Sequence, residues 1–529
     1  MPTADTVLTG AKIRTLDPGR PHATAVAVRD GLIAAVGDDR DAREWRGPGT
    51  RHLDLAGATL TPGWTDAHSH PVWGLELATG TDLSGIDRLE PLRAALRTAE
   101  RVDGWILAYG LDHNAFEGRE PHHTLIEDAV GGAPAYIRLY DGHSALLSER
   151  ALRLARIDGP HAFDQRASVV CDPQGRPTGH LIEHAAMELV TPVLPKTPWR
   201  ERADRLTALL SSMAATGLTS AHVMDLGGDA LRLLAAVESA GDLPLRLRLS
   251  PWCMPGADAA ELASLVALQR ERGRDWYVDG VKFFMDGTVE GGTAWLDHPD
   301  CHGRGTEAFW PDPGAYSAAV RVLHGAGVAT ATHAIGDAAV RHVLDTVASL
   351  PEAAGGPLRH RIEHIETVPD DQIGRFAPLG VVASMQPPHA AYTRADHSDA
   401  WSRRLGDERA ARAWRCRDLR DAGAVLALGS DWPIAGYDAR GILATAREPR
   451  GASPGPGLTG LMALEGLTSH AALAANEPER AGRIAPGFRA DFTALAVDPV
   501  GAPADEVASA PVTLTMASGR VTHLLGRPV

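Results

Sequence analysis

Hydrophobic and polar residues alternate in short runs near both ends of the chain, whereas a different pattern fills the middle. Near the start, residues 25–29 and 32–37 alternate in this way and are bounded by Asp-Gly and Gly turns, which is typical of short β-strands. A similar pattern returns at residues 512–521. These strand-rich ends predict one small β-sandwich domain that is assembled from residues 1–60 and 485–529.

The middle of the chain, residues 61–484, alternates short apolar runs with helical segments such as residues 199–216 and 338–350. This alternation is typical of parallel strands that are joined by helices. Eight of the apolar runs are predicted to be strands, and they end near His70, Asp225, Trp252, Asp286, His333, His364, Pro387 and Asp431. Eight such units predict an α/β fold of the (β/α)8 TIM-barrel class.

A long stretch, at about residues 72–198, separates the first predicted strand from the second. It contains strand-like runs of its own at residues 105–109 and 135–140. We expect this stretch to be a large insertion on the active-site side of the barrel, where it forms a lid or a pocket wall.

The predicted strand ends carry the candidate chemistry. His68 and His70 lie two positions apart in an extended segment, so both can point to the same side. Two neutral imidazoles that converge in this way can bind a divalent metal. Each candidate alone also fits a simpler role, as a core-edge histidine, a capping aspartate or a lysine that reaches solvent. Together at the mouth of one barrel they predict a metal site, with the ligands His68, His70, Lys282, His333, His364 and Asp431.

The composition of the chain argues against some classes of partner and predicts a cellular compartment. The 529 residues carry a net charge of −15, which argues against a nucleic-acid surface or an anionic membrane surface. The four cysteines are far apart, as expected for reduced thiols in a cytoplasmic protein. The sequence shows neither a signal peptide nor an apolar run of membrane-spanning length. We expect a cytoplasmic protein with a small-molecule substrate, and a homodimer is an open option.

Four motifs together resemble the metal-dependent amidohydrolase superfamily. They are Thr-Pro-Gly-Trp-x-Asp-x-His-x-His at residues 61–70, His-Ala-Ile-Gly-Asp at 333–337, Arg-Ile-Glu-His at 361–364 and Gly-Ser-Asp-Trp-Pro at 429–433. Within that superfamily the chain is similar to the YtcJ-like branch, which includes N-substituted formamide deformylase. The resemblance extends over nearly the whole chain.

This resemblance implies a site for one or two divalent metal ions. The first metal is expected at His68, His70 and Asp431. The second is expected at His333 and His364. Lys282, carboxylated on its amine, is expected to bridge the two, because a free ammonium there would repel a metal. In a one-metal site His68, His70, His333 and Asp431 would suffice. Zinc is the first choice, and iron, manganese or nickel also suit these ligands.

The implied reaction is hydrolysis of a carbon–nitrogen bond other than a peptide bond, in an amide or an N-substituted formamide. Asp431 is expected to act as general base on metal-activated water and then as general acid. His143 and Trp432 are expected to contact the substrate. Deamination, or hydrolysis of a carbamate or lactone, is an alternative on the same metal site. A non-catalytic scaffold with the same fold is a more remote alternative.

Three further segments match motifs of other enzyme classes. Residues 455–460 fit G-x-G-x-x-G and residues 451–455 fit G-x-S-x-G, but neither motif follows a predicted strand, as a dinucleotide site or a nucleophile elbow requires. Residues 360–364 fit H-x-x-E-H, an inverted zinc-peptidase motif that requires a helix with His360 and His364 on one face. That interpretation leaves His68, His70 and Asp431 unexplained.

Overall fold

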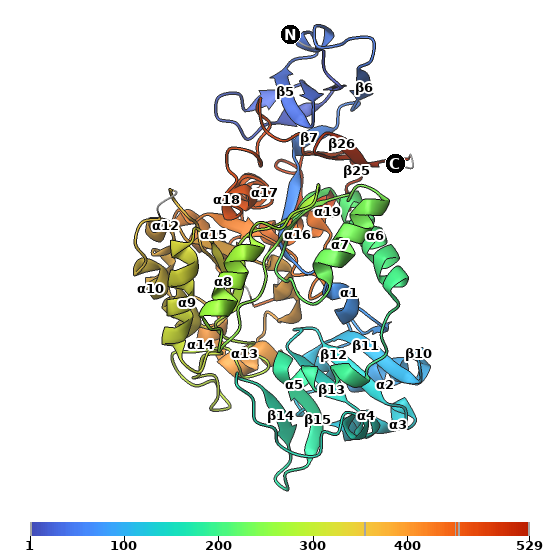
Figure 1. Ribbon diagram of the computed structural model, residues 1–529, viewed down its shortest axis with the longest axis vertical. Helices are drawn as coiled ribbons and strands as arrows, with labels where there is room; N and C mark the ends of the chain where they lie inside the picture. The colour runs from blue at the N-terminus through green and yellow to red at the C-terminus, as the bar shows by residue number, and fades with distance from the viewer. Residues whose placement is uncertain (1–2, 354–355, 450, 453–454, 527–529) are drawn as a thin grey trace.

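The structure is a computed structural model that describes residues 3–353, 356–449, 451–452 and 455–526. Figure 1 shows the strands of the two chain ends at the top, parallel strands with their helices in the middle, and strands β11–β15 at the bottom. Among the described residues, no helix combines the length and the apolarity needed to cross a membrane.

Strands from the two chain ends lie side by side in one six-stranded sheet, in the order β26-β25-β24-β7-β2-β3. Its strands are β2 (Lys12–Arg14), β3 (His22–Ala23), β7 (Thr59–Pro62), β24 (Phe492–Leu495), β25 (Val512–Ala517) and β26 (Arg520–Leu524). A second sheet, β5-β4-β1-β6, contains β1 (Thr6–Thr9), β4 (Ala25–Arg29), β5 (Leu32–Gly37) and β6 (Arg51–Asp54). Side chains of both sheets, including Leu8, Val26, Leu60 and Phe492, form one buried cluster. The two ends therefore share a hydrophobic core.

The middle of the molecule contains two parallel sheets, β18-β17-β16-β8 and β19-β20-β21-β22-β23. Their strands are β8 (Trp64–Ser69), β16 (Leu218–Val223), β17 (Arg246–Leu249), β18 (Trp276–Val278), β19 (Val281–Phe284), β20 (Thr330–Ala334), β21 (Arg361–His364), β22 (Val382–Met385) and β23 (Leu426–Leu428). A strand occurs at each of the eight predicted positions, and β18 is an additional short one. Most of their residues are buried, as expected for parallel strands that are covered on both faces.

Main-chain hydrogen bonds link the two parallel sheets at both edges. Beside β8, the amide of Asp431 donates to the carbonyl of His68 at 2.6 Å, and the amide of His70 donates to the carbonyl of Trp432 at 2.9 Å. At the other edge, the amide of Lys282 donates to the carbonyl of Pro251 at 2.8 Å. Because the strands are parallel, their carboxyl ends open on the same side of the molecule.

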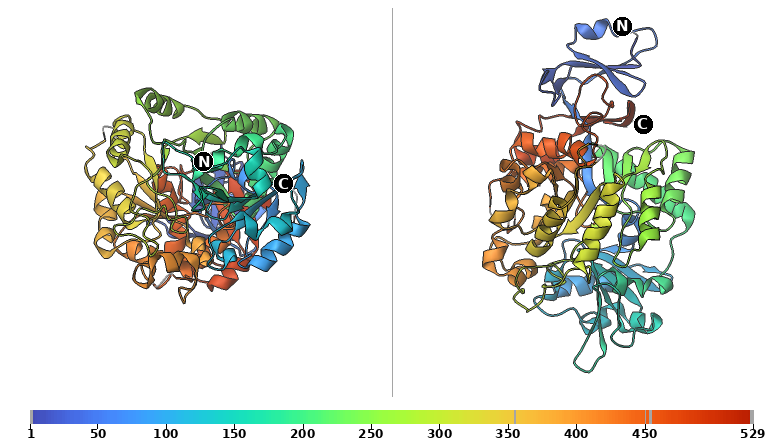
Figure 2. Two further views of the ribbon diagram at one scale, coloured as in Figure 1. Left: turned by 90° about the horizontal axis from the view of Figure 1, so that it is seen from below. Right: turned by 60° about the vertical axis from the view of Figure 1, so that its left-hand side comes forward.

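Helices lie outside these strands, as the right-hand view of Figure 2 shows. Helix α6 is typical, since Leu206, Leu210 and Met213 are buried at a helical spacing on one face. The longer helices are α6 (Trp199–Ala215), α7 (Ala230–Ala240), α8 (Ala259–Leu268), α9 (Pro313–Gly325), α10 (Asp337–Ala348) and α16 (Ala439–Arg447). Shorter ones are α1 (Gly74–Leu77), α11 (Asp370–Ile373), α12 (Phe376–Leu379), α13 (Ala400–Leu405), α14 (Asp407–Ala410), α15 (Cys416–Asp421), α17 (Gly460–Gly466), α18 (Ser469–Ala474), α19 (Ala504–Ser509), η1 (Asp41–Arg43) and η5 (Pro387–Tyr392).

The stretch between β8 and β16 forms a sheet of its own, with the order β10-β11-β12-β13-β15-β14 and β9 beside β11. Its strands are β9 (Thr81–Asp82), β10 (Arg101–Val102), β11 (Trp105–Leu111), β12 (Ala135–Leu139), β13 (Ser144–Leu147), β14 (Ser168–Cys171) and β15 (Pro177–Ile182). Its helices are α2 (Leu89–Thr98), α3 (Glu127–Val130), α4 (Glu149–Leu154), α5 (His184–Glu188), η2 (His113–Phe116), η3 (His123–Leu125) and η4 (Thr191–Val193). Along β11, Ile106 and Ala108 pack with α2, whereas Trp105 and Leu107 pack with α4. Two hydrophobic faces thus stabilise this sheet.

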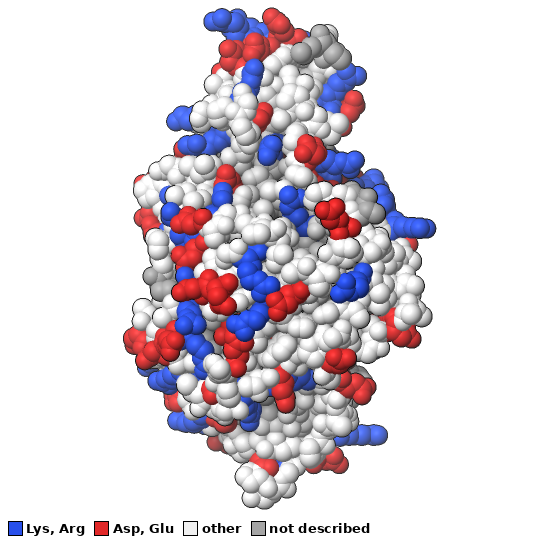
Figure 3. All heavy atoms as spheres, turned by 90° about the vertical axis from the view of Figure 1, so that its left-hand side faces the viewer, with Lys and Arg blue, Asp and Glu red and all other residues white. Residues whose placement is uncertain are grey.

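Charged side chains of both signs are mixed on the molecular surface. On the face drawn in Figure 3, basic and acidic side chains of the described residues lie close to one another over most of the area. Many of them form exposed ion pairs, such as Arg153 with Glu149 at 2.6 Å. On this face, neither sign of charge forms a large separate patch.

Candidate metal centre

Four histidines surround the carboxylate of Asp431, which follows β23 at the carboxyl end of the parallel strands. One carboxylate oxygen, Oδ1, lies 3.3 Å from His68 Nε2 and 3.1 Å from His70 Nε2. The other, Oδ2, lies 3.8 Å from His364 Nδ1 and 3.7 Å from His389 Nε2. All five side chains are buried. Asp431 therefore lies between two pairs of imidazoles.

The nitrogen and oxygen atoms that face one another here are suited to a metal ion. Two groups of three residues place their ligand atoms within 4.8 Å of one another: His68, His70 and Asp431, and His364, His389 and Asp431. Four buried atoms have no hydrogen-bond partner among the described residues: His68 Nε2, His364 Nδ1, His389 Nε2 and Asp431 Oδ1. A buried polar atom without a partner costs about 1–3 kcal/mol. Imidazole and carboxylate donors in this arrangement fit a divalent metal, which would satisfy them.

Carboxylates behind the two histidines of β8 fix their rings. His68 Nδ1 lies 2.6 Å from Glu363 Oε2, and His70 Nδ1 lies 2.7 Å from Asp225 Oδ2. Such a bond from the second ring nitrogen is the usual support of a metal-binding histidine. It directs the Nε2 atom of each ring toward Asp431.

The electrostatics of the site favour a positive charge beside an ionised Asp431. Burial alone would raise the pKa of Asp431, but His68 and His70 lower it well below its usual range. Burial lowers the pKa of His68 to about 4. Burial acts in the same direction on His70, but the neighbouring carboxylates of Asp225 and Asp431 outweigh burial and raise its pKa to about 9. A cation is thus favoured at Nε2 of His70, whether a proton or a metal ion.

The backbone is strained at two of these residues. His364 has a φ of 76° and Asp431 a φ of 59°, in the left-handed region that residues other than glycine seldom adopt. Such conformations cost about 1–3 kcal/mol each and cluster at functional sites. The surrounding sheet edge holds both side chains toward the same space.

Lys282 and His333 line the same cavity but lie outside the two groups of three. Lys282, in β19, is 1% exposed, and burial lowers the pKa of its amine to about 8. His333, in β20, donates from Nε2 to the carbonyl of Gly287 at 3.0 Å, while its ring centre lies 4.4 Å from that of His364. The ligand atoms of His364, His389 and Asp431 thus lie within 4.8 Å of one another, and His333 lies beside this group.

Residues of the inserted sheet close one side of this cavity, which has a volume of about 570 Å³. His143 lines it, and its Nδ1 lies 2.7 Å from Glu183 Oε2. Tyr140 and Asp141 line it as well. This position agrees with the expectation that the insertion forms a pocket wall.

Comparison with known proteins identifies the family of the chain. A model described as the amidohydrolase family matches residues 51–523 of the chain. The chain belongs to the amidohydrolase family. It is therefore a hydrolase that acts on carbon–nitrogen bonds, as the motifs predicted.

Three curated relatives match this amidohydrolase over almost its whole length. It is 30% identical to Protein LONG AFTER FAR-RED 3 of Arabidopsis thaliana, over 94% of the chain and 88% of the relative. It is 27% identical to putative amidohydrolase YtcJ of Bacillus subtilis (strain 168), over 97% and 98%. It is 25% identical to N-substituted formamide deformylase of Arthrobacter pascens, over 97% of each. The predicted YtcJ-like branch is thus confirmed.

Solved structures share the fold of the amidohydrolase. An uncharacterised metal-dependent hydrolase from Pyrococcus horikoshii OT3 is 24% identical, with a TM-score of 0.72, over 94% of this chain and 99% of that one. Atrazine chlorohydrolase TrzN from Arthrobacter aurescens TC1, complexed with zinc, is 14% identical, with a TM-score of 0.58, over 99% and 96%. They show the fold, and the donor set around Asp431 is what fits a divalent metal.

The structure places Trp432 differently from the other predicted site residues of the amidohydrolase. Its ring packs against Gly74 and lies 6.1 Å, between ring centres, from Tyr437. Trp432 is not among the described residues that line the cavity, whereas Trp73 is. The chain turns after Asp431, so the side chain that follows points away from the metal ligands.

Two residues of the site were missed from the sequence although a signal was present. His389 lies in η5, two positions after the predicted end of a strand at Pro387. Asp225 was itself a predicted strand end. Both follow the rule that identified His68 and His70, because a polar side chain just past a parallel strand faces the mouth. Glu183, by contrast, reaches His143 only through the packing of the insertion.

The structure also decides between the alternative motifs. Residues 361–364 form β21 rather than a helix. His360 lies against Thr330 and His324, with 2.9 Å between its Nε2 and His324 Nδ1. Its imidazole thus forms hydrogen bonds away from the metal site, which excludes the zinc-peptidase interpretation. Ser453 of the G-x-S-x-G motif lies outside the described residues.

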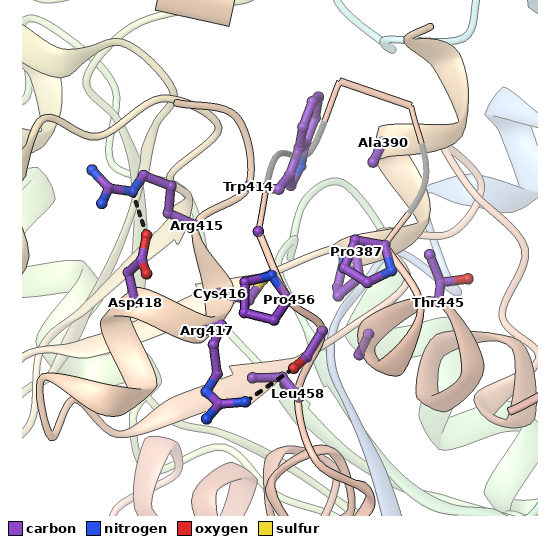
Figure 4. Close-up of a pocket in the computed structure, with 14 residues that line it drawn as sticks. Pro387, Ala390, Trp414, Arg415, Cys416, Arg417, Asp418, Thr445, Pro456 and Leu458 are labelled. Atoms are coloured by element: carbon purple, nitrogen blue, oxygen red, sulfur yellow. Dashed lines mark hydrogen bonds and ion pairs between the residues drawn. The ribbon is translucent and has the colours of Figure 1, made fainter. Parts of the chain in front are cut away.

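A second cavity, of about 450 Å³, lies behind η5 and is drawn in Figure 4. Pro387 and Ala390 of η5 form one wall of it. Its arginines are engaged, since Arg415 donates to Asp418 at 2.6 Å and Arg417 donates to the carbonyl of Gly457 at 3.3 Å. This cavity therefore offers mainly packing surface, and the candidate chemistry lies at Asp431.

Proposed function

We propose that this amidohydrolase hydrolyses a carbon–nitrogen bond other than a peptide bond in a small amide or N-substituted formamide. The observation that carries the proposal is the position of Asp431 among four imidazoles, three of which have a buried nitrogen without a hydrogen-bond partner among the described residues. The similarity to N-substituted formamide deformylase makes formamides the first substrate class to examine.

We further propose which residues hold the metal. His68, His70 and Asp431 bind the first ion, and His364 binds a second together with His333 and His389. Zinc is the first candidate, with iron, manganese and nickel as alternatives. A divalent metal supplies Lewis acidity at such a site, which acidifies water and polarises a carbonyl group.

Lys282 is proposed to bridge the metal ions as a carbamate. Its buried amine has a pKa near 8, so a substantial neutral fraction exists at neutral pH. In that form Nζ can bond to the carbon of carbon dioxide, with loss of one proton, to give an N-carboxylate. Conversion from cation to anion removes the repulsion that an ammonium would exert on a metal.

The proton transfers are assigned to Asp431. Its carboxylate is ionised at neutral pH, so it can accept a proton from the water that attacks the substrate carbonyl carbon. It then delivers this proton to the leaving nitrogen as the carbon–nitrogen bond breaks. His143, which Glu183 orients, is positioned to contact the carbonyl oxygen of the substrate.

The two linked parallel sheets are proposed to form a (β/α)8 barrel within residues 61–484. The hydrogen bonds at both sheet edges support this proposal. Residues 1–60 and 485–529 would then form a separate β-sandwich domain, and residues 72–198 the insertion. Their shared core supports that division.

Elemental analysis of the purified protein, with a substrate screen, tests the proposed function. The screen should contain N-substituted formamides, N-acyl amines, carbamates, lactones and exocyclic amines. We expect about one or two equivalents of a divalent metal and turnover of a formamide or amide. Full activity of metal-free protein, or turnover of peptide bonds alone, would contradict the proposal. Preferred turnover of an amine, carbamate or lactone would assign the site to the alternative reaction.

A further inference from the structure

A cavity rich in arginine lies beside the metal site. It has a volume of about 960 Å³, which includes space open to solvent. Four arginines line this arginine cavity: Arg119, Arg304, Arg403 and Arg404. Such a cluster is unexpected in a chain whose net charge is −15.

Two of these arginines have no carboxylate partner among the residues that the structure describes. Arg404 donates from Nε to Asp300 at 2.7 Å, and Arg119 lies 3.3 Å from Glu117. Arg304 and Arg403 form no ion pair with any described residue. Their guanidinium groups retain free donors for a planar anion, which arginine binds in a bidentate manner.

A buried histidine in the cavity also lacks a partner. His180, in β15, is only 5% exposed, and its Nε2 has no hydrogen-bond partner in the part of the chain that the structure describes. Burial lowers the pKa of His180 to about 3, so the ring is neutral. A neutral imidazole can donate one hydrogen bond to an anion from Nε2, and a ligand would thereby satisfy this atom.

The arginine cavity shares a wall with the metal site. Glu290 lines both. Its side chain accepts a hydrogen bond from the hydroxyl of Tyr140 on the metal side, while its main-chain carbonyl accepts one from Arg404 at 3.0 Å. In addition, His113 of the arginine cavity lies 2.8 Å from Asp141, which lines the metal site. The two cavities therefore adjoin each other across Glu290.

We propose that the arginine cavity binds a carboxylate that the substrate carries at the end remote from the scissile carbon–nitrogen bond. The unpaired guanidinium groups of Arg304 and Arg403 recognise the carboxylate, and His180 donates a further hydrogen bond. This assignment rests on the proposed function, and it narrows the substrate class to N-acyl or N-formyl compounds with a distal carboxylate. Glu120 and Glu290 on the cavity lining oppose an anion, but the four arginines outnumber these two carboxylates.

A matched pair of substrates tests the proposal. An N-formyl ω-amino acid and its primary amide have the same length and differ in charge. In the double variant Arg304→Gln and Arg403→Gln, the ratio of kcat/KM for the acid to that for the amide should fall about tenfold or more, because hydrogen bonds to charged groups are the strong ones. Arg412→Gln, which removes an exposed arginine paired with Glu408, should leave the ratio unchanged. An equal ratio in wild type and double variant would overturn the assignment.

A binding measurement separates this proposal from the proposed function. Glutarate serves as a probe that cannot be hydrolysed, and calorimetry compares its affinity for the metal-loaded wild type and for the double variant. We expect the Kd to rise about tenfold or more in the variant. Equal affinity, or no binding to wild type, would overturn the anion site even if formamides are hydrolysed. Absence of all turnover together with arginine-dependent glutarate binding would instead overturn the proposed function and the substrate assignment, and leave an anion site.

Discussion

Buried charged groups occur at both ends of the parallel strands, but the two ends differ in how far neighbouring protein groups satisfy them. At the carboxyl ends, Asp431 faces four imidazoles and several of the facing atoms have no partner. At the amino ends, Arg246 begins β17 and donates to Asp491 at 2.8 Å, while the amide of Ser518 donates to the same carboxylate at 2.6 Å. The amino-end carboxylate is thus satisfied by the protein itself.

This difference separates a structural role from a functional one. Burial would raise the pKa of Asp491, yet Arg246 outweighs it and the pKa falls below its usual range. The pKa of Asp431 is lowered as well, but by histidines whose other atoms remain unsatisfied. A buried charge that the chain neutralises stabilises the fold, whereas one that the chain leaves incomplete is available for a ligand.

The largest effect is expected from Asp431→Asn. An amide cannot accept the proton of water as a carboxylate does, and general acid–base catalysis contributes about 10²–10⁴-fold to a rate. We expect kcat to fall at least a thousandfold or so while thermal unfolding shows a folded protein. Steady-state kinetics and circular dichroism check this. Unchanged kcat in the variant would refute the assigned role.

At the other end of the strands, Asp491→Asn should lower the free energy of unfolding by about 3 kcal/mol, because it leaves the Arg246 guanidinium buried without its counter-ion. Activity per folded molecule should stay near that of wild type. Chemical denaturation measures the loss, and Asp164→Asn, at an exposed position, should change stability by less than about 0.5 kcal/mol.

The pH dependence of stability offers an independent check on the amino-end pair. Because the folded pKa of Asp491 lies below its ordinary value of 3.8, its contribution is fully present above that value. It is lost as the pH falls through the lower, folded pKa. Between about pH 5 and 2, the free energy of unfolding should therefore fall more steeply with decreasing pH for wild type than for Asp491→Asn. Denaturation curves at each pH measure it. Parallel curves would show that this pair does not stabilise the fold.

A smaller effect is expected at the support of the metal ligands. Asp225→Asn weakens the bond that orients His70, and loss of such a partner typically costs about 10–100-fold in metal affinity or activity. Competition with a chelator measures the affinity. Asp229→Asn is a matched control, because Asp229 follows on the same loop but pairs with Arg202 at 2.9 Å. Equal metal affinity in both variants would argue against the role of Asp225.

The smallest effect is expected on the exposed surface. Glu149→Gln breaks the ion pair with Arg153, whose side chains are 56% and 65% exposed. Exposed pairs contribute about 0–1 kcal/mol, so both stability and activity should remain close to wild type. A loss comparable to that of Asp491→Asn would contradict the distinction between buried and exposed charge.

Much of this arrangement could be predicted because it follows from periodic patterns. The alternating runs at the chain ends and the apolar runs before His70, His333, His364 and Asp431 specify strands directly. Histidines at the ends of parallel strands then share one mouth by geometry. The same reasoning covers His389 and Asp225, which were missed because their motifs were interpreted only as strand ends.

Other features depend on packing between distant segments and leave little trace in the sequence. The alternation along β11 indicates a strand but not that its neighbours bring His143 to Glu183 at 2.7 Å. The direction of the Trp432 ring depends on the turn after Asp431 and on the room beside Gly74. Likewise, no local pattern indicates that Gly287 engages Nε2 of His333.

The pairing of β7 with β24 has a consequence for how the protein is made. Thr61 of β7 pairs with Thr493 of β24, which lies 432 residues later in the chain. At about 5–20 residues per second, β7 waits roughly 20–90 s during synthesis before its partner is translated. Throughout that time the buried face of β7 has no neighbour on one side, and its open edge can pair with other chains. Efficient production should therefore depend on a low growth temperature or on chaperones that shield this strand. Removal of the last 40 or so residues should cause aggregation rather than give a stable shortened protein.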